Sequence, residues 1–114
     1  MKTSELTGAA LDWAVSKCEG RDRTYLDYFA SQWHLNKSLR YSTNWAQGGP
    51  IIERLKGLEF KQWLESKPES CCEAHIHNHE GDWISFGSTP LIAAMRCYVA
   101  SKLGDDVEIP RGLE

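Results

Sequence analysis

Apolar residues near the N-terminus recur with the spacing of a buried helical stripe. The stripe comprises Leu11, Ala14, Val15 and Cys18. It predicts a helix from about Gly8 to Glu19, with Thr7 as the N-cap and Gly20 just past its end. Trp13 falls on the opposite side of this helix. Because a lone exposed tryptophan is uncommon, we expect the helix to be covered on two sides; the alternative is that Trp13 belongs to a second surface.

The best-defined helix is predicted near the other end of the chain. Thr89 is placed to cap it, Pro90 suits its first turn, and Gly104 ends it. Its apolar stripe comprises Leu91, Ile92, Met95, Val99 and Leu103. A further short helix is allowed by the four-residue spacing of Tyr25, Phe29 and Trp33.

A β-hairpin is predicted between these helices. Cys72–Asn78 alternates polar and apolar residues, His79–Asp82 supplies a turn, and Trp83–Phe86 returns as the second strand. The segment Phe60–Leu64 fits either a strand or a helix. The tail Asp105–Pro110 reads as extended, where it could pair at a sheet edge. The fold class that follows is α+β, with a small antiparallel sheet and two or three packed helices.

Length and composition fit one compact domain over residues 1–114. A chain of 114 residues can bury a sufficient core without cross-links. The net charge is −3 and no two Lys or Arg residues are adjacent, which makes nucleic acid an unlikely partner. The four cysteines show no disulfide spacing. Without a signal peptide or a membrane-length apolar run, we expect a cytoplasmic protein with no membrane partner.

The segment Tyr41–Arg54 has the composition of a ligand-binding loop. Glycines let backbone N–H groups approach a ligand, amides donate and accept hydrogen bonds, a tryptophan can stack on a ring, and an arginine can hold a phosphate. The candidate residues are Asn44, Trp45, Gln47, Gly48, Gly49, Glu53 and Arg54. The alternative is a tight turn with a buried tryptophan and a structural Glu53–Arg54 pair.

The start of the last predicted helix adds two candidate residues. Free N–H groups of a first helical turn favour an anion near Thr89, and Arg96 lies two turns further along the same edge. The small residues Ala93 and Ala100 share that edge and would let a ligand or partner come close. The alternative is an ordinary cap with Arg96 paired to a carboxylate. We expect the glycine turn to fold against this helix start and form a shared cleft.

The histidines and cysteines are weaker indicators of function. His75, His77 and His79 alternate and would share a face with Glu73, which could hold a transition metal. A solvated polar face is the favoured interpretation, so no metal or other cofactor is expected. Cys18 is assigned to the core, and Cys97 to a surface or interface. No catalytic motif is present, so an enzyme is less expected than a binding protein.

Three ordered blocks of the sequence resemble the NinX-like family of small phage and prophage proteins. The blocks are Leu6–Val15, Tyr41–Arg54 and Thr89–Val99. The resemblance implies a phage origin and the cytoplasm of an infected bacterium, but no activity. Asn44 departs from the family pattern, which often has Asp there, so a role that needs a carboxylate at this position is in doubt. Residues 21–39 form its variable part.

Two functions are therefore predicted. The first is a binding protein for a small anionic, nucleotide-like ligand, by analogy one that sequesters a host defence signal. The second is a non-enzymatic protein–protein interaction module that contacts a host or phage factor, with Trp13, Trp33 and Trp45 as aromatic anchors. A homodimer is compatible with either function.

Overall fold

The computed structural model describes residues 1–32, 40–62 and 68–113. Short 3-10 turns occur at Thr3–Glu5 and Pro68–Ser70. The main elements are α1 (Gly8–Cys18), α2 (Arg23–Gln32), α3 (Trp45–Arg54), β1 (Leu58–Gln62), β2 (Cys72–Asn78), β3 (Gly81–Gly87) and α4 (Pro90–Leu103). The predicted α+β class is confirmed.

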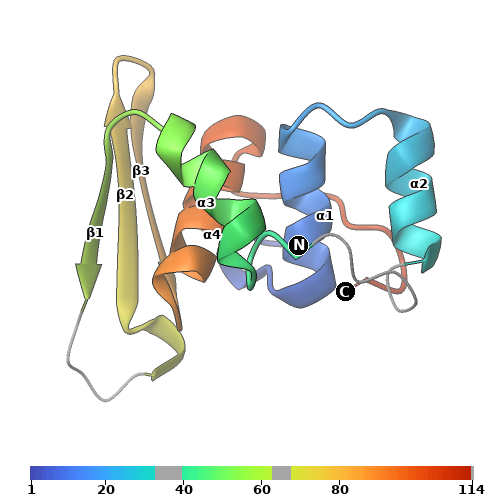
Figure 1. Cartoon of the computed structure of the whole chain (residues 1–114), viewed down its shortest axis with the longest axis horizontal. Helices are drawn as coiled ribbons and strands as arrows, with labels where there is room; N and C mark the ends of the chain where they lie inside the picture. The colour runs from blue at the N-terminus through green and yellow to red at the C-terminus, as the bar shows by residue number, and fades with distance from the viewer. Residues whose placement is uncertain (33–39, 63–67, 114) are drawn as a thin grey trace.

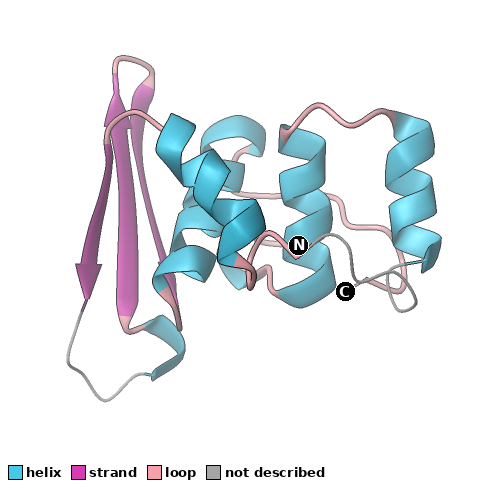
Figure 2. Ribbon diagram, in the orientation of Figure 1, coloured by secondary structure: helices cyan, strands magenta, loops and turns pink. Residues whose placement is uncertain are grey.

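The three strands form one antiparallel sheet in the order β1-β2-β3. Ile76 of β2 lies between Leu58 of β1 and Trp83 of β3 in the register. The predicted hairpin is confirmed, with His79 and Glu80 as its two-residue turn. The described helices lie on one side of the sheet, and none of them covers its other face (Figures 1 and 2). We call this the outer face.

Helix α4 is the central element of the core. It packs against β2 and β3 on one side and against α1 on the other. Its buried residues therefore surround the helix: Leu91, Ala93, Ala94, Met95, Cys97, Tyr98, Val99 and Ala100. The expected surface position of Cys97 is wrong, because its side chain is fully buried. The small edge formed by Ala93 and Ala100 is likewise covered by the chain itself.

Helix α1 is covered on two sides, as predicted from Trp13. The indole Nε1 of Trp13 donates a hydrogen bond to the carbonyl of Leu26 at 3.3 Å, and only 7% of the Trp13 surface is exposed. This contact attaches α2 to α1 and confirms the further short helix; Trp33 lies outside the described residues. Thr7 occupies the N-cap position of α1 but makes no side-chain capping bond.

The C-terminal tail pairs with the N-terminus instead of the sheet. Asp106 forms a β-bridge with Lys2, and the Val107 N–H donates to the Met1 carbonyl at 2.9 Å. The expectation of pairing at a sheet edge is therefore wrong. The tail then continues past α1 and α2 (Figure 1), which brings its residues to a surface that those helices share.

Candidate functional site

The predicted ligand-binding loop is a helix. Asn44 caps α3, because its side-chain oxygen accepts a hydrogen bond from the Ala46 N–H at 2.9 Å. The Gly48-Gly49-Pro50 sequence, read as a turn, lies inside this helix. Pro50 lacks an N–H, so one helical hydrogen bond to Ala46 is lost. The cap and the packing of the following residues against α4 outweigh that loss.

Gly48 of α3 packs closely against the start of α4. A Cβ atom built on Gly48 would lie 2.5 Å from Leu91 Cδ1 and 2.5 Å from the Tyr41 carbonyl oxygen. The expected contact between the glycine segment and the start of the last helix is present, since Leu91 is the second residue of α4. At Gly48 the Leu91 side chain fills the space between the two helices, so this contact is helix–helix packing.

Arg54 and Arg96 both have partners within the protein. Arg54 Nη2 lies 2.6 Å from Glu19 Oε1, which joins the end of α3 to the end of α1. Arg96 donates from Nε to the Leu6 carbonyl and from Nη1 to the Phe86 carbonyl, each at 2.7 Å. Burial lowers the pKa of Arg96. The expectation that Arg96 pairs with a carboxylate is wrong for the described residues, because its Nε and Nη1 donors go to backbone carbonyls and no ion pair joins it to a carboxylate there.

The remaining candidate residues are divided between structural and exposed positions. Thr89 caps α4 by accepting from the Ile92 N–H at 3.1 Å, as predicted. The side-chain oxygen of Gln47 accepts from the Arg40 N–H. Trp45 is 54% exposed, and Glu53 is exposed. The tryptophan buried in a tight turn, which was the alternative interpretation, is therefore wrong. Ligand binding by these residues stays a prediction.

A cleft of about 530 Å³ lies where α1, α2 and the C-terminal tail meet. We call it the tail cleft. Its lining residues are Trp13, Lys17, Arg21, Leu26, Asp27, Glu108, Ile109 and Pro110. A volume of this size is within the range of small-molecule sites, which is roughly 300–1,000 Å³. Apolar and aromatic walls occur here together with charges of both signs, a combination that orients a polar ligand.

Both cations of the tail cleft lie over aromatic rings. Lys17 Nζ is 5.6 Å from the centroid of the Trp13 ring, one helical turn away on α1. The Arg21 guanidinium carbon is 4.8 Å from the Tyr25 ring centroid. These contacts hold long, mobile side chains near the cleft and leave their N–H groups able to bind an anion.

Only part of the tail cleft can be predicted from the sequence. Trp13 lies opposite the buried stripe of α1, and Lys17 follows it one helical turn later on the same side. Glu108 to Pro110 could not be assigned to this surface, because the return of the tail depends on backbone pairing with the N-terminus.

The three histidines are divided between the sheet and the hairpin turn, and His79 lies in the turn as predicted. His75 and His77 lie on the outer face of the sheet, whereas His79 is in the hairpin turn and almost fully exposed. Asp82 of β3 completes the group in its place, since its side chain contacts both His75 and His77.

The fold defines a class of small α+β proteins with helices stacked on one face of an antiparallel sheet. Within the described ranges, no helix has both the length and the apolar composition to cross a bilayer. The chain belongs to the bacteriophage P22 NinX family, whose model matches residues 2–102. The resemblance predicted from three sequence blocks is confirmed. A comparison with curated protein sequences found no match. The tail that lines the cleft follows the matched region.

Proposed function

We propose that this protein binds a small anionic, nucleotide-like ligand in the tail cleft, without turnover. The observation that carries the proposal is the combination of a ligand-sized cavity, a Trp13 wall and two cations, Lys17 and Arg21. The proposal keeps the ligand class expected from the sequence. It moves the site from α3 to the tail cleft, because Arg54 and Arg96 already have partners within the protein.

The lining residues match the chemistry of a nucleotide. Its phosphate would be bound by Lys17 and Arg21. Its hydroxyl or amino groups would donate to the carboxylate of Glu108, which lines the same cleft. The apolar surfaces of Leu26 and Ile109 would contact the sugar or base. A bare inorganic anion would use only the two cations and would bind more weakly.

The biological role in this proposal is sequestration. A phage protein that lowers the free concentration of a host nucleotide signal in the cytoplasm needs affinity and abundance but no catalytic group. The cleft is suited to this role because its ligand would be held by charge and shape.

Indole N–H resonances provide the test of the site. We expect adenosine 5′-monophosphate to shift the Trp13 indole signal in ¹H–¹⁵N spectra with saturation, and inorganic phosphate to shift it less. Lys17→Ala and Arg21→Ala should each weaken binding, and Lys61→Ala on the sheet is the matched control. A shift at Trp45 instead of Trp13 would favour the α3 site. No saturable shift at either tryptophan with the nucleotide or phosphate would overturn the proposal.

The outer face supports a second candidate function, recognition of a protein partner. Ile84 and Phe86 of β3 are 54% and 43% exposed on this face. Their neighbours in the register include His75 and Glu73 of β2, and Glu59 follows next on β1. Lys61 of β1 lies opposite Glu73, so the apolar pair has neighbours of both charges and suits a partner surface with an apolar centre and a charged rim.

Site-specific crosslinking tests this second candidate. A photoreactive side chain at Ile84 should give a defined crosslinked product in infected cells, whereas one at the exposed Tyr28 on α2 should not. Glu73→Lys should abolish the product if the partner has a basic rim. A product that forms equally from both positions, or that survives the charge reversal, would count against the outer face as a specific interface.

A further inference from the structure

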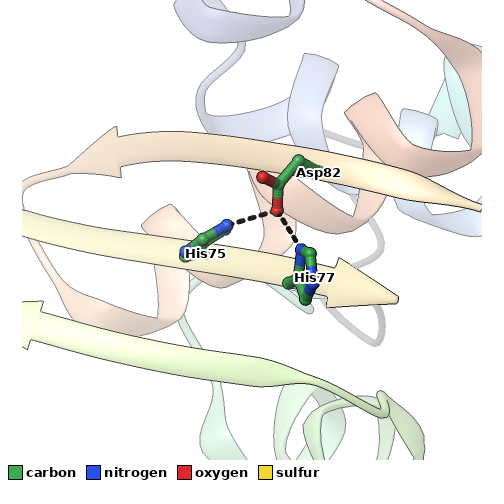
Figure 3. Close-up of side chains that lie close together, drawn as sticks. All are labelled: His75, His77 and Asp82. Carbon is green, nitrogen blue, oxygen red and sulfur yellow. Dashed lines mark hydrogen bonds and ion pairs between the residues drawn. The ribbon is translucent and has the colours of Figure 1, made fainter. Parts of the chain in front are cut away.

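Three potential metal-binding side chains converge on the outer face of the sheet. His77 pairs with Asp82 across the hairpin, and His75 lies two residues before His77 on the same side of β2. His75 Nε2 is 2.6 Å from Asp82 Oδ1, and His77 Nδ1 is 2.7 Å from the same oxygen (Figure 3). All three potential ligand atoms lie within 4.8 Å of one another. We call this group the His–His–Asp cluster.

We propose that the His–His–Asp cluster is a binding site for a first-row divalent transition metal of the zinc type. Two imidazole nitrogens and one carboxylate oxygen are ligands that Zn²⁺ accepts. Mg²⁺ and Ca²⁺ prefer sites made entirely of oxygen ligands, so the cluster should discriminate against them. Three protein ligands leave a fourth position for water or for an incoming group.

The required rearrangement is small. Zinc bonds of roughly 2.0–2.2 Å in a tetrahedral arrangement hold the ligand atoms about 3.4 Å apart. The Asp82 oxygen must therefore withdraw by less than about 1 Å from each ring nitrogen, and the two ring nitrogens, at most 4.8 Å apart, must approach each other by up to about 1.4 Å. Asp82 and His77 have 59% and 72% of their side-chain surfaces exposed, so both can move without disturbing the core.

The ring nitrogens that face Asp82 are also able to bind a metal. Whether His75 Nε2 and His77 Nδ1 donate to or accept from Asp82 depends on the tautomer of each ring. In a zinc complex these two nitrogens would present lone pairs to the metal, and each imidazole would carry its proton on its other nitrogen.

The hairpin holds the cluster in place. His75 and His77 belong to the middle strand, which is paired on both sides, and the two-residue turn fixes Asp82 opposite His77. The paired backbones limit the separation of the three Cα atoms. The metal site is on a different surface from the tail cleft, so it can exist whether or not the proposed nucleotide binds.

Zinc titration of metal-free protein tests the proposal. Vicinal thiols also bind zinc, and Cys71 Sγ lies 3.7 Å from Cys72 Sγ, so the titrations use a Cys71→Ser background. We expect saturable binding of one Zn²⁺ per chain by calorimetry. In NMR spectra, the ring signals of His75 and His77 should shift while that of His79 does not. Magnesium should produce neither effect.

Ligand variants separate a metal site from a hydrogen-bonded cluster. His77→Ala and Asp82→Asn should each weaken zinc binding by at least about 10-fold, since even groups that only support metal ligands typically contribute 10–100-fold. His79→Ala, in the adjacent turn, should bind as the parent does. Lys17→Ala should also leave zinc binding unchanged. Absence of saturable binding, or equal losses in His79→Ala and His77→Ala, would overturn the proposal and leave only a hydrogen-bonded cluster.

Discussion

Asp12 of α1 accepts two hydrogen bonds from Ser42, one from the backbone N–H at 2.9 Å and one from the hydroxyl at 2.8 Å. Both residues are buried. The segment that leads into α3 is therefore attached to α1 by a buried carboxyl group. Burial raises the pKa of Asp12, although the hydrogen bonds from Ser42 and the charge of Arg40 act in the opposite direction.

We expect Asp12→Ala to destabilise the protein by about 1–3 kcal/mol, because it leaves the buried Ser42 N–H without its acceptor. Asp12→Asn is the matched control, since its amide oxygen can accept the same two hydrogen bonds. Urea unfolding at neutral pH measures both changes. Equal losses in the two variants would show that the charge of Asp12, and not its role as an acceptor, supports this contact.

The raised pKa of Asp12 also predicts a pH dependence. A carboxyl group whose folded-state pKa exceeds its unfolded value contributes stability that is present at low pH and lost as pH rises through the folded pKa. Relative to Asp12→Asn, the wild-type free energy of unfolding should therefore fall as pH increases above about 4, the ordinary pKa of an aspartate. Parallel pH profiles for the two proteins would contradict this linkage.

The three sequence blocks that resemble the phage family meet one another in the core. Asp12 of the first block bonds Ser42 of the second, and Gly48 of the second packs against Leu91 of the third. Arg96 of the third block bonds the Leu6 carbonyl of the first. These contacts give the three blocks structural roles in the core, whereas the exposed Trp45 and Glu53 of the second block are not explained by them.

The sequence predicted those helices and strands whose ends are set by residues close to them in the chain. The ends of α4 were predicted because Thr89, Pro90 and Gly104 act within a few residues of themselves. Helix α3 was missed because Gly48-Gly49-Pro50 is locally a turn signal, whereas its helical state depends on contact with α4. The carbonyl partners of Arg96 come from 90 and 10 residues away, so no local pattern could identify them.

Gly48 should tolerate alanine much less well than Gly49. Gly48→Ala would force a methyl group against Leu91 and the Tyr41 carbonyl, and overpacking of this kind typically costs about 1–3 kcal/mol. The corresponding Cβ at Gly49 meets nothing within 4 Å outside its two chain neighbours. Gly49→Ala should change stability by less than about 1 kcal/mol, because the helix propensity of alanine is opposed by contact of its Cβ with the Pro50 ring. Thermal or urea unfolding compares the variants.

This pair of substitutions also tests the helical state of α3 itself. If residues 48 and 49 formed a ligand-binding turn, both substitutions would disturb it. A large loss of stability in Gly48→Ala with little change in Gly49→Ala fits a helix that is packed on one side. Comparable large losses in both variants would favour the turn that was predicted from the sequence.

Replacement of Arg96 should lower the stability of the folded protein. Arg96→Met keeps much of the side-chain length but leaves the Leu6 and Phe86 carbonyls without their donor, at a cost of about 1–3 kcal/mol. Arg54→Met is the control: its guanidinium is more than half exposed, and such surface pairs contribute at most about 1 kcal/mol. Unfolding curves measure both. A phosphate-binding role for Arg96 would instead appear as lost ligand binding with unchanged stability.

Thiol labelling should distinguish Cys97 from Cys71 in the native protein. Burial raises the pKa of Cys97 to about 11, and its thiol donates to the Trp83 carbonyl at 3.1 Å. At pH 8 only ~0.1% of such a thiol is ionised, and the thiolate is the reactive form. Cys71 is partly exposed and should react with a disulfide reagent at least about 100-fold faster than Cys97. Cys71→Ser should remove the fast phase, whereas Cys97→Ser should leave it intact. Rapid labelling of Cys97 in the native protein would contradict its burial and would favour the surface position that was predicted from the sequence.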